Sequence, residues 1–198
     1  MNARNGLLMV MMEPPPAIEE EFNAWYDTEH LPERIALPGF LSGVRYVCAD
    51  GYPRYMALYD LESEAVLDSD SYLSVSGSRF SPWTKRVTSR MPGYRVAATQ
   101  FSPGKATVGR ATRLLVIKLR DAAAIGEEKA VFAVQQMLEG IPEVRQVCLF
   151  ATSGARVDHF VLASLAGPPS RPLDLSRAGS IADHIDMVNT YVPYSPAG

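Results

Sequence analysis

Short apolar runs alternate with segments of helical periodicity along this chain, and the same order of segments occurs twice. The run at 7–12 (Leu-Leu-Met-Val-Met-Met) resembles the run at 114–119 (Leu-Leu-Val-Ile-Lys-Leu), and a helix-like segment follows each of them. Proline signals then lead into second strand-like runs at 44–48 and 145–148. Apolar runs of this length, bounded by turn residues, are typical of β-strands. Because matching segments recur after roughly 100 residues, they indicate a weak internal repeat.

A third pair of strand-like runs, at 54–61 and 158–165, keeps the same spacing. Turn residues separate the second and third strands of each half, as a β-hairpin requires. The resulting order, strand-helix-strand-strand-helix-strand, is that of the ferredoxin-like βαββαβ unit. We therefore predict an α+β protein of two tandem ferredoxin-like repeats. The first repeat covers residues 1–103, a linker covers 104–110, and a second, more divergent repeat covers 111–198.

Each predicted sheet has helices on one face only, so its other face needs a cover. A duplicated chain can provide one by packing its two open sheet faces together into a barrel-like sandwich. Small-molecule binding sites occur preferentially at such interfaces between packed units. We therefore expect a small-molecule site between the two sheets. The tandem repeat can complete its own barrel, and a homodimer stays open as a further level of assembly.

The charge balance limits the classes of partner. The chain has 198 residues, of which 47% are hydrophobic and 21% charged, and 19 Lys and Arg against 22 Asp and Glu give a net charge of −3. This is an ordinary globular composition without a basic block, which weighs against nucleic-acid or membrane-surface binding. The apolar run at 7–12 is far shorter than the ~20 residues that span a bilayer. We expect a cytoplasmic protein.

Metal and cofactor motifs are missing from the sequence. The two cysteines, Cys48 and Cys148, and the three histidines, His30, His159 and His184, lie scattered without the spacing of a zinc site. Glycine-rich phosphate loops and nucleophile elbows do not occur either. We predict free thiols, no metal and no cofactor.

The segment 18–34 carries the most informative pattern. On a uniform α-helix at ~100° per residue, Glu29 falls inside the apolar arc of Phe22, Trp25 and Tyr26, and His30 lies at its edge. A carboxylate in such a place has to be protonated, hydrogen-bonded or paired with a cation. The candidate cations are His30, Arg34 and Arg45.

Two interpretations of this segment stay open. In the catalytic one, Glu29 or His30 transfers protons, because burial raises a carboxyl pKa and imidazole titrates near neutrality. In the structural one, Glu29 anchors the helix to the following loop and His30 caps the last carbonyl groups. Two or more titratable groups aimed into one open cavity would favour the catalytic interpretation.

The same residues carry a family resemblance. Residues 22–33 (Phe-Asn-Ala-Trp-Tyr-Asp-Thr-Glu-His-Leu-Pro-Glu), 37–40 (Leu-Pro-Gly-Phe), 45–46 and 55–59 resemble the EthD-like branch of the dimeric α/β-barrel superfamily. The resemblance extends over residues 5–100. The second half matches only in its order of elements, and its helix-like segment offers only Phe132 and Met137 on the apolar face, so a site built on this motif is single.

The resemblance implies a barrel fold and a style of chemistry. Members of the branch include cofactor-free monooxygenases of polyketide anthrones, muconolactone-type isomerases, dehydratases, cyclases and haem-dependent enzymes. A haem role here would need an axial ligand, for which His30 and His159 are the candidates.

We therefore predict a cofactor-independent enzyme that moves a proton on a small aromatic or polyketide-like molecule, as an isomerase, cyclase, dehydratase or monooxygenase does. His30 would be the acid or base, Glu29 its orienting partner or alternate proton carrier, and Arg45 or Tyr46 would steady an enolate-like oxygen. The alternative is a non-catalytic ligand-binding or structural protein of the same fold. The predicted substrate-binding residues are Trp25, Tyr26, Tyr46, Tyr59 and His159.

Overall fold

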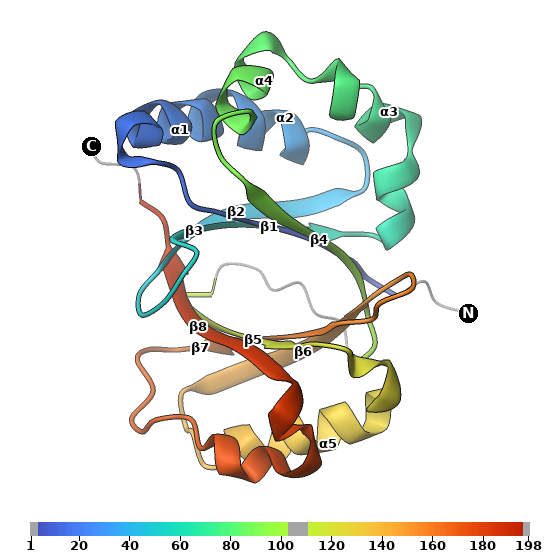
Figure 1. The fold of residues 1–198 in the computed structure, drawn as a ribbon, viewed down its shortest axis with the longest axis vertical. Helices are drawn as coiled ribbons and strands as arrows, with labels where there is room; N and C mark the ends of the chain where they lie inside the picture. Colours follow the sequence, from blue (N-terminus) through green and yellow to red (C-terminus); the bar gives the residue numbers. More distant parts are fainter. Residues whose placement is uncertain (1–3, 103–110, 196–198) are drawn as a thin grey trace.

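Eight antiparallel strands close a barrel in the order β1-β3-β2-β8-β5-β7-β6-β4. The computed structural model describes residues 4–102 and 111–195, so the predicted linker at 104–110 lies outside the described residues. Figure 1 shows helices α1 to α4 on one side of the barrel and α5 on the opposite side. The predicted α+β class and the barrel-like closure of two sheets are confirmed.

The first half of the chain supplies four neighbouring strands and most of the helices. Its strands lie in the order β4-β1-β3-β2. The strands are β1 (Gly6–Met12), β2 (Phe40–Cys48), β3 (Tyr55–Leu61) and β4 (Gly93–Gln100). The helical elements are η1 (Pro16–Ile18), α1 (Glu19–Trp25), η2 (Tyr26–His30), α2 (Leu31–Ile35), η3 (Glu64–Asp68), α3 (Asp70–Leu73), η4 (Gly77–Arg79) and α4 (Pro82–Thr88).

The second half has the matching strand order β8-β5-β7-β6. Its strands are β5 (Arg113–Leu119), β6 (Val144–Thr152), β7 (His159–Leu165) and β8 (Ile185–Pro193). Its helical elements are η5 (Ala122–Ala124), α5 (Glu127–Leu138) and η6 (Leu175–His184). The two halves join where residues 46–48 pair with 191–193, and where 98–100 pair with 150–152.

Alternation along the strands separates two environments. In β3, Met56 and Leu58 belong to the apolar cluster inside the barrel, whereas Tyr55, Ala57 and Tyr59 belong to the cluster beneath the helices. Successive side chains of a strand point to opposite faces, and both faces of this strand are covered. This explains why the whole of β3 is buried.

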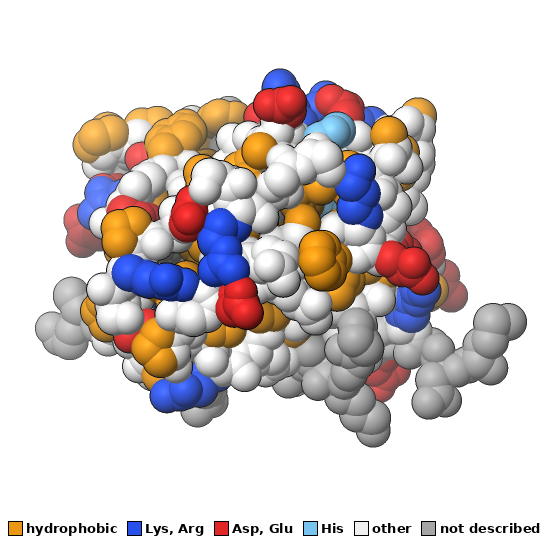
Figure 2. All heavy atoms as spheres, turned by 90° about the horizontal axis from the view of Figure 1, so that it is seen from below, with side chains coloured by type: hydrophobic (Ala, Val, Ile, Leu, Met, Phe, Trp, Pro, Cys, Tyr) orange, Lys and Arg blue, Asp and Glu red, His pale blue; other side chains and the backbone are white. Residues whose placement is uncertain are grey.

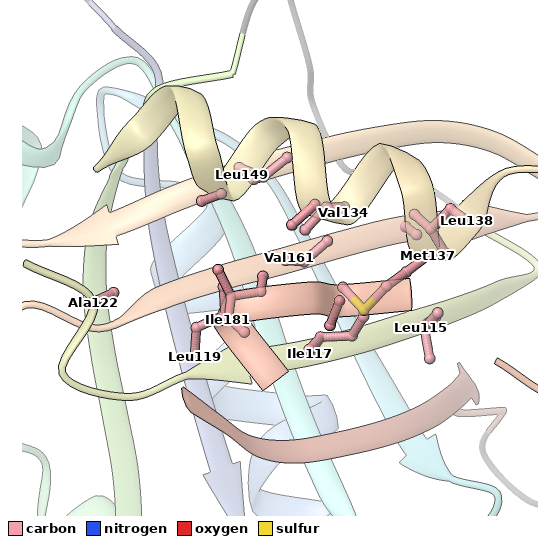
Figure 3. Close-up of a cluster of buried hydrophobic side chains, with 14 of the residues drawn as sticks. Leu115, Ile117, Leu119, Ala122, Val134, Met137, Leu138, Leu149, Val161 and Ile181 are labelled. Carbon is pink, nitrogen blue, oxygen red and sulfur yellow. The ribbon is translucent and has the colours of Figure 1, made fainter. Parts of the chain in front are cut away.

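Helix α5 covers the outer face of the second sheet. Figure 3 shows Val134, Met137 and Leu138 pointing from α5 toward the strands, where Ile117 and Val161 lie. Phe132 is 63% exposed, so its predicted place on the apolar face is wrong, whereas Met137 is 1% exposed, as predicted. Small residues on the helix, Ala130 among them, form the rest of its buried face.

The surface fits the balanced charge of the sequence. Viewed from the side of α5, acidic, basic and hydrophobic side chains are interspersed (Figure 2). No helix in the described parts of the chain has the length and apolar character needed to cross a bilayer.

We expect a Met137→Ala variant to lose about 2–5 kcal/mol of unfolding free energy, because it removes buried volume beneath α5. A matched Phe132→Ala variant on the same helix removes an exposed ring and should change that free energy by less than about 0.5 kcal/mol. Urea titrations followed by circular dichroism measure both values. Equal losses in the two variants would contradict the packing described for α5.

Candidate functional site

The candidate site is built around one helical segment of the first half, formed by α1, η2 and α2 in sequence. Pro16 is the first residue of the preceding turn η1, and Glu19, Glu20 and Glu21 occupy the first turn of α1, where acidic side chains interact favourably with the helix dipole. At its other end Gly43 of β2 lets α2 lie close to the sheet. A Cβ atom at Gly43 would be 2.5 Å from Ile35 Cγ2.

Between α1 and α2 the helix widens into a π-helical turn. The backbone N–H of Leu31 donates to the carbonyl oxygen of Tyr26, five residues earlier. Such turns insert one residue into a helix and occur frequently at functional sites. Here the turn carries the Tyr26–His30 segment that dominates the sequence motif.

The π turn changes which side chains meet. His30 lies over Trp25, with ring centroids 4.4 Å apart and planes at 33°, and its centroid is 5.1 Å from that of Tyr26. In a uniform α-helix, residues five apart point about 140° away from each other. On a uniform α-helix, Glu29 was predicted to lie among the aromatic rings. The wider π turn places His30 among the rings of Trp25 and Tyr26 instead.

A cavity of about 270 Å³ lies between this helix and the outer face of the first sheet. Four predicted site residues line it: Trp25, Tyr26, His30 and Tyr59. The prediction of a site between the two sheets is wrong for these residues, because a helix that covers a sheet directs its apolar arc to the outer face. The other lining residues are Leu8, Val10, Met12, Arg34, Tyr72, Phe80, Thr88, Met91, Gly93 and Arg95.

Three residues of this lining, each from a different element, have a buried polar atom without a hydrogen-bond partner among the described residues. The atoms are His30 Nδ1 from η2, Arg34 Nη1 from α2 and the Tyr59 hydroxyl from β3. Buried polar atoms are paired in the great majority of cases. Three such atoms in one lining therefore indicate a place where ligand or water atoms complete the hydrogen bonds.

Arg34 is a functional candidate that was predicted only as a cation for Glu29. It is 2% exposed and lines the cavity. Its Nη2 donates to the carbonyl oxygen of Val75 at 2.6 Å. The available signal was its spacing, since a residue four positions after His30 lies on the same helix face.

Charge in the cavity is dominated by arginine. Burial, together with the Arg34 charge, lowers the pKa of His30 to about 3, so its imidazole is neutral at pH 7. Burial raises the pKa of Tyr26 to about 12, and burial beside Tyr26 raises the pKa of Tyr59 well above its ordinary value. Both phenols stay protonated. Among the described residues, the lining contains Arg34 and Arg95 and no carboxylate.

Glu29 does not line this cavity. Its Oε1 accepts hydrogen bonds from the hydroxyls of Ser81 and of Thr84, the latter at 3.2 Å. The Thr84 hydroxyl also accepts a hydrogen bond from Trp25 Nε1 at 3.0 Å. Hydroxyl groups of α4 and its N-cap therefore bind Glu29, in place of the predicted cations His30, Arg34 and Arg45.

Arg45 and Tyr46, the two candidates for steadying an enolate-like oxygen, point to opposite sides of β2. Arg45 forms an ion pair with Asp27 and lies 3.9 Å from the ring centroid of Tyr194, on the outer face. Tyr46 is fully buried inside the barrel. Neighbouring positions of a strand alternate between faces. Neither residue lines the cavity of His30.

His159 lies in the second half, apart from the other predicted residues. It is 3% exposed, and its ring centroid is 4.7 Å from that of Phe101. In β7 it alternates with Phe160, which faces the barrel interior, so it shares the outer face with Val161 beneath α5. The hypothesis that His159 looks across a cavity between the sheets is therefore wrong.

The lowered pKa of His30 makes stability depend on pH. In the unfolded chain His30 binds a proton below its ordinary pKa of about 6.5. In the folded protein it binds that proton only near pH 3, because its pKa is lowered to about 3. The unfolding free energy should therefore fall as the pH drops from 6.5 toward 3. A His30→Gln variant should show a shallower fall in denaturant titrations across this window. Parallel curves for both proteins would contradict the buried, neutral imidazole.

Comparison with known proteins finds relatives in structure alone. No protein-family model matches the chain, and no curated protein matches it in sequence. A solved anthrone oxidase-like protein has 14% sequence identity and a TM-score of 0.61, with 97% of this chain and 92% of that chain covered. A "putative monooxygenase" from Lactobacillus acidophilus NCFM has 10% identity, 96% and 94% coverage and a TM-score of 0.51.

A heme-binding protein from Thermus thermophilus is also similar, at 8% identity, 97% and 92% coverage and a TM-score of 0.52. Identities this low show a shared fold and leave the activity open. The chain therefore shares with these solved structures an α+β fold, built here on a closed barrel of eight antiparallel strands.

Proposed function

We propose that this protein is a cofactor-independent enzyme that acts on a small aromatic or polyketide-like molecule by proton transfer, with His30 as the acid-base group. One observation carries the proposal. A titratable imidazole, a guanidinium and a phenol, all from residues that line one cavity, each have a buried polar atom without a hydrogen-bond partner among the described residues. A purely structural network would instead direct such groups into packed neighbours.

The lining suits a flat ring. Aromatic side chains of Trp25, Tyr26, Tyr72 and Phe80 surround the cavity, and Met12 is one of two flexible thioethers beside them. Aromatic rings favour stacked or edge-on partners, and methionine adapts to irregular shapes. Polar groups among the apolar walls would then fix the orientation of the bound molecule.

His30 is neutral at physiological pH, which is the form that accepts a proton. Burial and the nearby Arg34 make the imidazole of His30 a weak base. Negative charge that develops on a substrate oxygen beside Arg34 would offset the cation and strengthen the base. We propose that His30 takes a proton from a carbon next to a carbonyl group, and that Arg34 and Tyr59 receive the resulting enolate oxygen.

We propose positioning roles for two predicted catalytic residues. Glu29 holds η2 against α4 through Ser81 and Thr84, and Arg45 holds the outer face of β2 against α1 and η2 through Asn23 and Asp27. Membership in the EthD-like branch and the tandem repeat of residues 1–103 and 111–198 are also proposals. The matching strand orders of the two halves support the repeat. Cytoplasmic location and a homodimer stay predictions.

The residues around the three histidines do not fit haem, the group that one structural relative binds by name. The ring of His30 is stacked on Trp25, and its cavity of about 270 Å³ is too small for a porphyrin. His159 packs against Phe101, and His184 Nδ1 contacts the carbonyl oxygen of Arg120 at the surface. We derive no step through haem.

The test compares wild type with His30→Gln, using His159→Gln as the control histidine far from the cavity. Phenolic, lactone and polyketide-like compounds are screened by thermal shift, and bound compounds are followed by NMR for exchange of activated C–H protons in D₂O. We expect His30→Gln to lower the exchange rate about 100-fold or more, since general acid-base catalysis contributes 10²–10⁴-fold. The affinity of His30→Gln for the compound should change little. The exchange rate of His159→Gln should stay close to that of wild type.

Two results would redirect the proposal. Compounds that bind in the cavity without any exchange or turnover would establish the non-catalytic ligand-binding alternative. If no compound binds and His30→Gln mainly destabilises the fold, the segment has a structural role and the enzyme proposal fails.

A further inference from the structure

We infer that Arg34 selects ligands carrying an ionised oxygen on an aromatic framework, which binds the free Nη1 of its guanidinium. The inference rests on the proposed function, because it names the chemical class of ligand for the same cavity. It assigns Arg34 as the residue that determines specificity, a role distinct from proton transfer by His30.

The charge of Arg34 is buried and incompletely hydrogen-bonded. Arg34 is 2% exposed, and its Nη2 donates to the Val75 carbonyl oxygen and forms an ion pair with the Glu33 carboxylate at 3.4 Å. Nη1 has no hydrogen-bond partner among the described residues. A buried cation is stable when its donors are hydrogen-bonded, so an anionic ligand oxygen at Nη1 would complete the set.

The guanidinium of Arg34 is held in place by its protein neighbours. Its carbon lies 5.5 Å from the ring centroid of Tyr72 and 5.8 Å from that of Phe80. The hydrogen bond to Val75 restrains the group further. A planar donor fixed by rings and a backbone acceptor offers Nη1 in one direction, and a negative oxygen there forms a charge-assisted hydrogen bond.

Among the described residues, the cavity lining contains no carboxylate to compete for Arg34. Burial keeps the imidazole of His30 neutral and the phenols of Tyr26 and Tyr59 protonated at pH 7, because it lowers the pKa of His30 and raises the pKa of both phenols. Arg95 is exposed and donates to the Tyr72 hydroxyl at 3.3 Å. Water and salt screen such a surface charge, so Arg34 should decide the preference.

The test uses three bicyclic probes of similar shape: naphthalene, 2-naphthol and 2-naphthoate. Their dissociation constants are measured by calorimetry or fluorescence at pH 7.5, where the first two are neutral and the third is an anion. We expect wild type to bind 2-naphthoate at least tenfold more tightly than 2-naphthol. Arg34→Gln should reduce that ratio to about one without weakening naphthalene, and Arg34→Lys should keep part of it.

Arg95→Gln is the matched control, since it removes an arginine from the same lining at an exposed position. It should keep most of the preference. A nitrophenol titrated through its own ionisation separates the two sources of anionic oxygen. Tighter binding of its ionised form extends the ligand class to phenolates, and equal binding of both forms restricts the class to carboxylates.

An independent readout covers the case in which Arg34→Gln fails to fold. In wild type, bound 2-naphthoate should raise the pKa of His30 measured by NMR, and bound 2-naphthol should not, because only the anion offsets Arg34. Binding of all three probes with equal affinity would overturn the inference and leave the proposed function standing. If none of the probes or screened compounds binds the cavity, the proposed function fails and the inference fails with it.

Discussion

The π-helical turn at Tyr26–His30 is the constraint on which the site depends. It lets His30 lie over Trp25 and puts Arg34, four residues later, beside the same cavity. The turn is held from outside by hydroxyl groups at the start of α4, which bind Glu29 and Trp25. The hydrogen-bonded network of Glu29, Trp25 and the α4 hydroxyls therefore holds η2 in a defined position. It thereby positions the polar groups of the cavity that have no hydrogen-bond partner among the described residues.

The barrel explains why the cavity lies outside it. Its interior is occupied by large apolar side chains from every strand, such as Met9, Tyr46 and Phe150, which join the two halves. Strand alternation then gives the outer face its own side chains, which meet the helices. In the first half that layer includes short helical pieces between residues 64 and 88, and Tyr72 and Phe80 from this region complete the cavity.

The two halves share a strand order and differ in what covers their outer faces. The second half presents a regular α5 whose buried face, with Ala133, Val134 and Met137, packs directly on the strands. The first half presents a helix interrupted by the π turn and rich in aromatic residues. The cavity lined by aromatic side chains borders the interrupted helix of the first half, where the single Trp-Tyr-x-x-Glu-His motif lies.

Sequence alone determined the α+β class, the barrel closure and the segment that carries the site, because strand alternation, turn residues and the aromatic motif are local signals. It also identified Trp25, Tyr26, His30 and Tyr59, which line one cavity. Only the tertiary structure decided that Arg34 joins them and that Glu29, Arg45, Tyr46 and His159 do not. The π turn of the helix and the contacts with α4 decide the positions of Arg34 and Glu29. The face of the strand on which each side chain lies decides the positions of Arg45 and Tyr46 in β2 and of His159 in β7. A single sequence carries no local signal for such long-range geometry.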